Sequence, residues 1–139
     1  MKLRFYIICL ILAGIPLLGY SQGRKTIKTL GITSQTVKEY FVEEGIKDPV
    51  VESIEKYDTN GNVIELQEFN SEGQIKNWKK FKYDADENKI EETSIDAKGK
   101  VEERTAWIYK DGLLREKQYY DSRDRLTKRK EYIYEYRKE

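Results

Sequence analysis

A short phrase that recurs along the chain limits its fold more than any other feature. The clearest copies are residues 57–63, 69–75 and 95–101, and each reads apolar residue, Asp or Asn, two variable residues, Gly, one variable residue and a β-branched residue. Degenerate copies start at Tyr83, Tyr109 and Tyr120, so that successive copies begin 12, 14, 12, 14 and 11 residues apart. This spacing equals one strand plus a tight turn, and it predicts a row of hairpins.

Each polar position of the phrase has a role in a turn. An Asp or Asn side chain accepts a hydrogen bond from the backbone two residues on, and Gly adopts the positive φ that closes a three-residue hairpin with a bulge. The predicted turn residues of these two kinds are Asp58, Gly61, Asn70, Gly73, Asp84, Asp96, Gly99, Gly112 and Asp121.

Three of the turns depart from the common pattern. The copy at Tyr83 reads as one residue longer, with Asn88 in the Gly position, and Asp124 has that position in the last copy. Asn and Asp are the residues that best tolerate the left-handed conformation after Gly. Residues 110–113 are one residue shorter and fit a two-residue hairpin.

These signals predict an all-β fold, an antiparallel β-meander of about seven to eight strands in an open or curled sheet. The predicted strands are 50–57, 63–69, 75–83, 90–95, 101–109, 113–120 and 126–136. A further strand is favoured for residues 36–44, although Val37, Tyr40 and Phe41 are also spaced for one face of a short helix. Apolar residues beside the turns, such as Tyr57 and Val63, are expected to pair across strands.

The start of the chain reads as a secretory signal peptide. Lys2 and Arg4 precede an apolar stretch at 5–18, and Gly19 and Ser21 place small residues before a cleavage site. The stretch is shorter than a membrane-spanning helix needs, so we expect cleavage after Ser21, export, and no membrane insertion afterwards. The division that follows is a leader at 1–21, an N-terminal arm at 22–35 and a β-meander domain at 36–139.

Charge is balanced once this leader is removed. Without Lys2 and Arg4 the chain has 24 basic and 25 acidic residues, with the two signs interleaved. Such a balance argues against nucleic acid or an anionic membrane surface as the main partner. Charged residues make up 37% of the chain, so we expect a thin core.

The residues needed for most catalytic sites are absent. The chain has no histidine, and its single cysteine, Cys9, lies in the leader, which excludes nucleophile–histidine arrangements and structural zinc in the exported chain. Neighbouring carboxylates such as Glu91 and Glu92 point to opposite faces of a strand and cannot act as an acid–base pair. We therefore expect no enzymatic activity.

Asp84, Asp86 and Asn88 begin like a calcium-binding loop. That pattern needs Gly at its sixth position and Glu at its twelfth, where this chain has Lys89 and Ile95. The sequence therefore predicts a polar turn here, and we expect no metal or other cofactor.

Aromatic residues on the later strands give a hint of a binding surface. The candidates are Trp78, Trp107, Tyr132, Tyr134 and Tyr136. Flat polar-aromatic sheets suit extended protein or sugar partners, whereas the plainer interpretation is that Tyr tolerates a half-wet strand face. The three tyrosines also predict an exposed final edge that can accept a strand from a partner or from a second copy.

The Tyr-Asp-x-x-Gly-x-Val phrase at this spacing resembles the YD repeats of Rhs-type proteins, and more loosely the MORN-like repeats of small exported or antitoxin-type bacterial proteins. The match rests on the Tyr-Asp pairs that begin at Tyr57, Tyr83 and Tyr120, and it covers residues 50–136. Rhs-type repeats occur by the dozen and enclose a toxin, whereas six or seven units leave only a sheet. The leader ending in Ser-Gln is similar to those of exported proteins from Bacteroidota, which implies a Gram-negative periplasmic or extracellular setting.

The sequence thus predicts an exported, non-enzymatic repeat module that presents a β-sheet surface to a protein or glycan partner. One alternative, implied by the resemblance, is a toxin-neutralising protein. The other is a glycan-active enzyme that uses carboxylates alone, which would need a groove holding two carboxylates within reach of each other.

Overall fold

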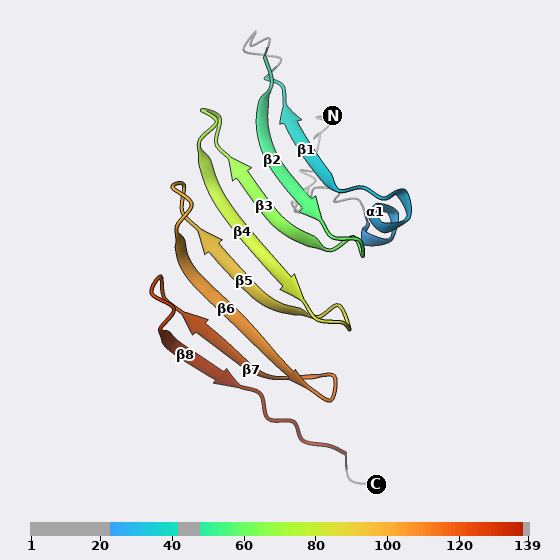
Figure 1. The fold of residues 1–139 in the computed structure, drawn as a ribbon, viewed down its shortest axis with the longest axis vertical. Helices are drawn as coiled ribbons and strands as arrows, with labels where there is room; N and C mark the ends of the chain where they lie inside the picture. The colour runs from blue at the N-terminus through green and yellow to red at the C-terminus, as the bar shows by residue number, and fades with distance from the viewer. Residues whose placement is uncertain (1–22, 42–47, 138–139) are drawn as a thin grey trace, which may run out of the picture.

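The computed structural model describes residues 23–41 and 48–137, and in them the chain forms one open sheet of eight strands and one helix (Figure 1). The elements are α1 (Arg24–Leu30), β1 (Ser34–Glu39), β2 (Val50–Tyr57), β3 (Val63–Phe69), β4 (Ile75–Tyr83), β5 (Lys89–Ile95), β6 (Val101–Lys110), β7 (Leu113–Tyr120) and β8 (Leu126–Glu131). The strands lie in sequence order and every neighbouring pair is antiparallel. The predicted all-β meander is confirmed, and the sheet is not closed, with β1 and β8 as its two edges.

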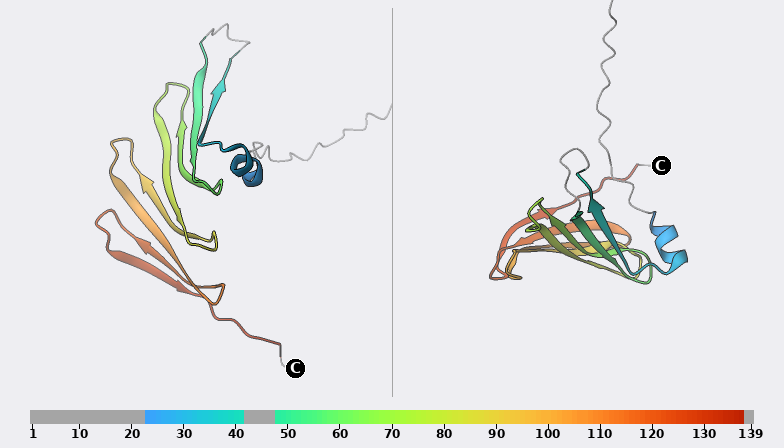
Figure 2. Two further views of the ribbon diagram at one scale, coloured as in Figure 1. Left: turned by 45° about the vertical axis from the view of Figure 1, so that its right-hand side comes forward. Right: turned by 90° about the horizontal axis from the view of Figure 1, so that it is seen from above.

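The sheet is a single curved layer, and α1 lies beside one end of its strands (Figure 2). Because no second sheet covers these strands, few side chains in the described ranges are buried. The buried hydrophobic residues are Ile27, Tyr57 and Ile95, and Asn62 is a buried polar one.

Five of the hairpin turns share one hydrogen-bond pattern. In the first, the Asp58 carboxylate accepts from the backbone N–H groups of Asn60 at 2.8 Å and Asn62 at 2.9 Å. The same pair of contacts is made by Asn70, Asp84, Asp96 and Asp121. A residue with positive φ stands three positions after each of them: Gly61, Gly73, Glu87, Gly99 and Asp124.

The turn between β4 and β5 differs from the sequence prediction. Tyr83 pairs with Lys89, so this turn has the same length as the others and contains no extra residue. Asn88 is not the left-handed residue; Glu87 is, with φ 64°. Asn88 instead donates through its backbone and side chain to Asp84, as Asn62 does to Asp58. The prediction failed because it placed the Gly-like position by residue preference alone.

The β6–β7 turn is the two-residue type. Asp111 and Gly112 both have positive φ, at 54° and 73°. This combination twists in the same sense as the strands that it joins.

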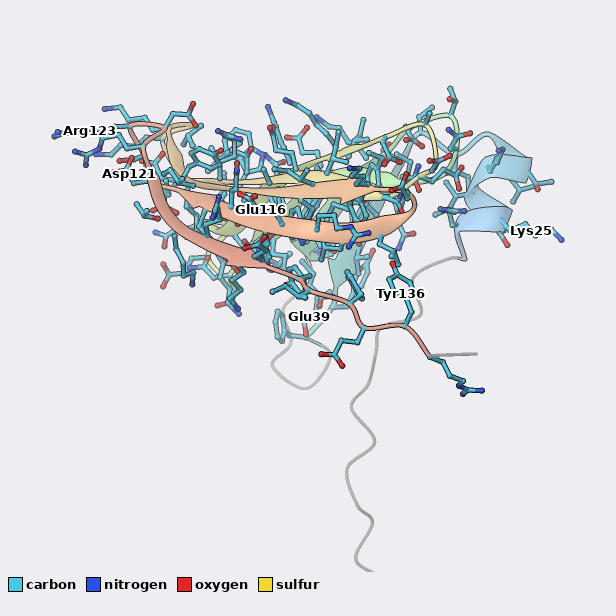
Figure 3. All side chains as sticks on the ribbon, turned by 90° about the horizontal axis from the view of Figure 1, so that it is seen from below. Lys25, Glu39, Glu116, Asp121, Arg123 and Tyr136 are labelled. Carbon is cyan, nitrogen blue, oxygen red and sulfur yellow. The ribbon has the colours of Figure 1, made fainter. Side chains whose placement is uncertain are left out.

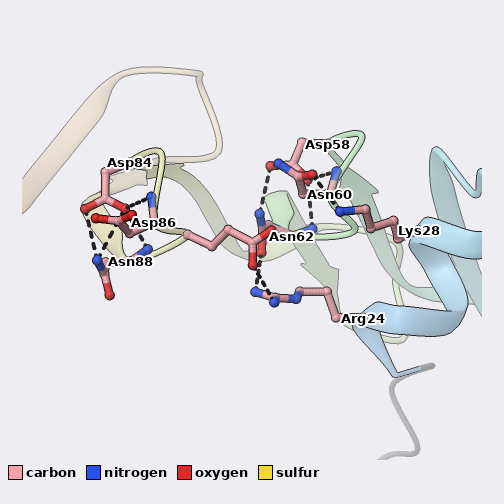
Figure 4. A network of polar contacts seen from close by, with 9 residues as sticks. Arg24, Lys28, Asp58, Asn60, Asn62, Asp84, Asp86 and Asn88 are labelled. Atoms are coloured by element: carbon pink, nitrogen blue, oxygen red, sulfur yellow. Dashed lines mark hydrogen bonds and ion pairs between the residues drawn. The ribbon is translucent and has the colours of Figure 1, made fainter. Parts of the chain in front are cut away.

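Helix α1 occupies the segment in which the sequence predicted an arm. Ile27 is 2% exposed and packs at the β2–β3 turn beside Tyr57. Arg24 donates to the Asn62 side chain at 3.2 Å, and its guanidinium lies 2.5 Å from Glu87 in the β4–β5 turn (Figure 4). The N-terminal arm predicted over 22–35 thus contains a helix at 24–30. One apolar side chain and three polar contacts, the third from the Lys28 ammonium to Asn60 at 3.1 Å, hold this helix to the sheet.

Both ends of the sheet also refine the predicted strands. Strand β1 covers Ser34–Glu39, so the helical alternative is wrong for residues 36–39, and residues 42–44 of that prediction lie outside the described ones. Strand β8 ends at Glu131 rather than at 136. The Tyr132 N–H still donates to the Arg115 carbonyl, but the Tyr134 hydroxyl takes the next carbonyl, that of Leu114, which ends the ladder. The predicted leader, 1–21, lies outside the described residues.

Apolar pairs flank the turns as predicted, including Tyr57 with Val63 and Ile95 with Val101. Each pair is followed by a one-residue register shift. Because residues alternate between faces and paired residues share one, the pairs at the α1 end lie on one face and those at the other end lie on the opposite face. Neither face is therefore continuously apolar.

Candidate binding surface

The two tryptophans of the predicted surface lie on opposite faces of the sheet. Trp78 and Phe81 are three residues apart on β4, so their side chains point in opposite directions. Phe81 pairs with Glu92, which pairs with Thr105, two residues before Trp107, so Trp107 shares the face of Phe81. One partner surface cannot contain both Trp78 and Trp107.

Trp78 belongs to a face on which charges are paired. Its Nε1–H donates to Glu65 at 2.9 Å, and the Lys56 ammonium donates to the same carboxylate at 2.9 Å. Partial burial alone would raise the pKa of Glu65, but these hydrogen bonds lower it below its usual range. The neighbouring cation Lys80 lies 5.7 Å from the Trp78 ring.

Ion pairs continue along this face toward β8. They join Lys82 to Glu91 at 2.7 Å, Arg104 to Asp124 at 2.6 Å, and Arg129 to Glu116 at 3.8 Å. The Arg104 guanidinium also lies 3.8 Å from the centre of the Tyr120 ring. The carboxylates on this face are thus paired with cations, although Lys80 itself forms no ion pair in the described residues.

The opposite face carries a continuous row of rings and ammonium groups. Register places Phe81, Glu92, Thr105, Tyr119 and Lys128 directly across β4 to β8. Lys89, Trp107 and Lys117 lie on the same face next to this row. We call Phe81, Lys89, Trp107, Lys117, Tyr119 and Lys128 the aromatic–lysine stripe.

Within the stripe, each lysine lies over at least one ring. Lys89 is 5.3 Å from the Phe81 centroid and 4.6 Å from that of Trp107. Lys117 is 4.8 Å from Trp107 and 5.0 Å from Tyr119, and Lys128 is 4.1 Å from Tyr119. Each contact contributes about 0.5–1 kcal/mol at a site this exposed. The contacts hold the ammonium groups against the sheet, where a ligand could reach them.

Positive charge is in excess at the stripe. Glu92 lies within the stripe, 2.8 Å from both Lys79 and Lys89, and Glu103 is a further carboxylate on this face. Within the described residues, Lys117 and Lys128 form no ion pair. Hydrogen bonding and charge from Lys117, together with nearby lysine charges, lower the pKa of the Tyr119 hydroxyl.

The three C-terminal tyrosines of the predicted surface are not on a strand. They follow β8, and Tyr136 lies on the outgoing chain (Figure 3). The Tyr134 hydroxyl donates to the Leu114 carbonyl at 2.7 Å, and its ring lies 5.3 Å from the Arg115 guanidinium. Tyr134 is therefore anchored to β7, while Tyr136 is 71% exposed.

No cluster of metal-ligating side chains accompanies these surfaces in residues 23–41 and 48–137. That part of the chain has no group of three or more acidic, histidine or cysteine side chains placed to bind a metal ion. Its one helix is too short and too polar to cross a membrane. The hollows of the sheet are open depressions, such as the one lined by Val51, Ile54 and Phe69.

Sequence reasoning selected Trp107 but left out the lysines around it. Lys89, Lys117 and Lys128 come from three different strands and have no common sequence spacing. The strand register could have revealed these lysines. Because five turns have equal length, counting residues outward from each turn places the three lysines beside Trp107 or Tyr119. The mistaken extra residue after Tyr83 concealed the position of Lys89.

Comparisons with known proteins add no relative: no family model matches the chain, and no curated protein or solved structure matches it. The resemblance to YD or MORN-like repeats stays a prediction.

Proposed function

We propose that the chain is an exported, non-enzymatic binding module that presents its sheet surface to a protein or glycan partner. The observation that carries this proposal is the aromatic–lysine stripe. It gathers three rings and three ammonium groups from five strands onto one accessible face.

The shape of the molecule supports an extended partner. Strands lie about 4.8 Å apart, so the stripe runs about 19 Å across β4 to β8. Its side chains are half-buried, and Lys128 is exposed. A surface of this length and flatness suits a chain-like ligand better than a compact small molecule, which binds in concave pockets.

The chemistry of the stripe supports binding rather than catalysis. Partial burial alone would raise the pKa of Glu92, but hydrogen bonds from Lys79 and Lys89 lower it. A carboxylate held ionised by two lysines is a poor general acid at neutral pH. Glu92 therefore serves to position the lysines.

A capture experiment tests the proposed function. The full chain, immobilised, is exposed to envelope extract and culture fluid of the native organism. We expect one major component to be retained, and to be lost with a Trp107→Ala/Lys117→Gln variant. The matched control is Trp78→Ala/Lys80→Gln, which changes the same pair of residue types on the opposite face and should retain the component.

Two results would contradict the proposal. One is equal retention by both double variants, since the stripe would then not be the binding surface. The other is no retained component from either source. Far-ultraviolet circular dichroism of each variant verifies that the sheet is intact.

A further inference from the structure

We propose that the aromatic–lysine stripe binds an anionic glycan, a chain of acidic sugars that lies across strands β4 to β8. This inference rests on the proposed binding function and names the class of ligand.

Charge selects an anionic ligand. Lys89 has Glu92 as a partner, but Lys117 and Lys128 have no ion pair in the described residues. Lys130 adds a further cation, because it pairs with Lys117 across β7 and β8 and so shares its face. The opposite face, with its ion pairs at Glu65, Glu91 and Asp124, lacks such an excess. Complementary charge therefore directs an acidic chain to one face only.

The rings select a ligand with flat apolar faces. Phe81, Trp107 and Tyr119 lie on β4, β6 and β7, so they form separate platforms along the stripe. The C–H groups on the face of a sugar ring are weakly positive and meet the negative face of an aromatic ring favourably. In the free protein these rings are in contact with lysines. An acidic sugar can displace a lysine from its aromatic ring. The carboxylate of the sugar then pairs with the ammonium group, and the face of the sugar ring packs on the aromatic ring.

The backbone beneath the stripe favours a glycan over a peptide. Strands β5, β6 and β7 each pair with a neighbour on both sides, so their backbone N–H and C=O groups are already hydrogen-bonded within the sheet. A peptide lying across them would leave its own amide groups without strand partners, which is costly once they are shielded from water. Peptides that bind sheets through their backbone add to an edge instead. Sugar hydroxyls can be satisfied by Thr105, Glu92 and water.

Binding of the full chain to polygalacturonate tests this proposal. The matched ligand is the same polymer with its carboxylates methyl-esterified, which keeps the sugar rings and removes the charge. Titration calorimetry should show binding to polygalacturonate, at least about tenfold weaker binding to the ester, and weakening between about 50 mM and about 300 mM sodium chloride, where screening increases.

Variants on the two faces locate the site. Trp107→Ala/Lys117→Gln should weaken binding at least about tenfold, and Lys89→Gln/Lys128→Gln, which leaves every ring in place, should do the same. Trp78→Ala/Lys80→Gln should change affinity less than about twofold. Equal affinity of wild type and both stripe variants would overturn the proposal.

Other polyanions separate this inference from the broader function. Equal or tighter binding of poly-glutamate or of single-stranded oligothymidylate would also overturn the glycan proposal. The site would then recognise negative charge or nucleic-acid bases and not sugar rings. If no glycan binds while the capture from native extract still depends on Trp107 and Lys117, the glycan assignment fails and the proposed binding function stands. If capture fails as well, both fail.

Discussion

Two regions of the sheet accommodate their aromatic residues in different ways. At the β2–β3 turn, helix α1 covers the sheet, and Tyr57 is 5% exposed, with its hydroxyl donating to Glu55 at 2.5 Å. At the aromatic–lysine stripe none of the elements formed by residues 23–41 and 48–137 covers the rings, and lysine side chains lie over them instead. On this single-layer sheet, the aromatic side chain at the β2–β3 turn is buried, whereas the aromatic rings of the stripe are in contact with lysine ammonium groups.

The two regions are therefore expected to have different roles: the end covered by α1 contributes to stability, and the stripe contributes to binding. Burial of Ile27 and Tyr57 removes apolar surface from water and contributes to folding. The lysines of the stripe place their ammonium groups over half-exposed rings. Such contacts contribute only about 0.5–1 kcal/mol each, so a ligand can displace the lysines at low cost. We expect substitutions at the covered end to change stability and substitutions at the stripe to change binding.

The sharpest test of the covered end is Ile27→Ala. Removing a side chain that is 2% exposed should lower the free energy of unfolding by about 3 kcal/mol, because it loses transfer energy and leaves a cavity. Leu30→Ala on the same helix is the control: this residue is 68% exposed and should cost less than about 0.5 kcal/mol. Urea titration measures both, and similar values would show that α1 does not stabilise the sheet.

A glycine pair separates backbone strain from helix contact. Gly61 and Gly73 have φ of 79° and 77° in equivalent turns, but a Cβ on Gly61 would lie 2.5 Å from the Arg24 carbonyl, whereas one on Gly73 meets open space. Gly73→Ala should destabilise by about 1 kcal/mol from φ alone, and Gly61→Ala by about 2 kcal/mol. Equal losses of unfolding free energy in urea would mean that α1 moves away from the added methyl group without loss of stability.

Acidic pH should lower the free energy of unfolding by protonating Glu92 in the aromatic–lysine stripe. Because its pKa is lower in the folded chain than in the unfolded one, its contribution is present above the ordinary glutamate pKa near 4.3 and is lost as the pH falls. The loss is about 1 kcal/mol or less, since the ion pairs are partly exposed. Glu92→Gln should therefore show a smaller drop in unfolding free energy between neutral and acidic pH than the wild type does. An unchanged drop would assign the acid sensitivity to other carboxylates.

A double-mutant cycle measures the contact between Lys89 and Trp107. Its coupling energy in urea unfolding should be about 0.5 kcal/mol, as expected for a cation 4.6 Å from the ring at a half-exposed site. The same cycle for Lys80 and Trp78, 5.7 Å apart, should give a smaller value. Coupling that is larger on the Trp78 face would reverse the comparison of the two faces.

The smallest effect concerns Tyr119 and leaves stability unchanged. Since Lys117 lowers the pKa of its hydroxyl, Lys117→Gln should raise that pKa toward the usual tyrosine value near 10. Ultraviolet difference titration, with Tyr119→Phe to identify the signal, measures the shift. No shift would show that the ammonium group does not reach Tyr119 in solution.

The sequence by itself determined the meander. Asp or Asn at the start of each turn and a residue that tolerates positive φ three positions later are local requirements, so their spacing gave the strand order and the pairing beside each turn. It also excluded histidine chemistry, because the chain contains no histidine. The error at Glu87 arose because Glu has no preference of its own for the left-handed region, whereas the pairing of Tyr83 with Lys89 sets the turn length and puts Glu87 in that position.

Only the tertiary structure decided which residues share a surface. Trp78 and Trp107 look equivalent in the sequence, but the two turns between β4 and β6 and their register shifts put them on opposite faces. One register step moves a side chain to the other face, so an error in one turn length rearranges every later assignment. Docking of α1 was equally hidden, because a seven-residue helix is not stable alone and forms only where Ile27 finds the sheet.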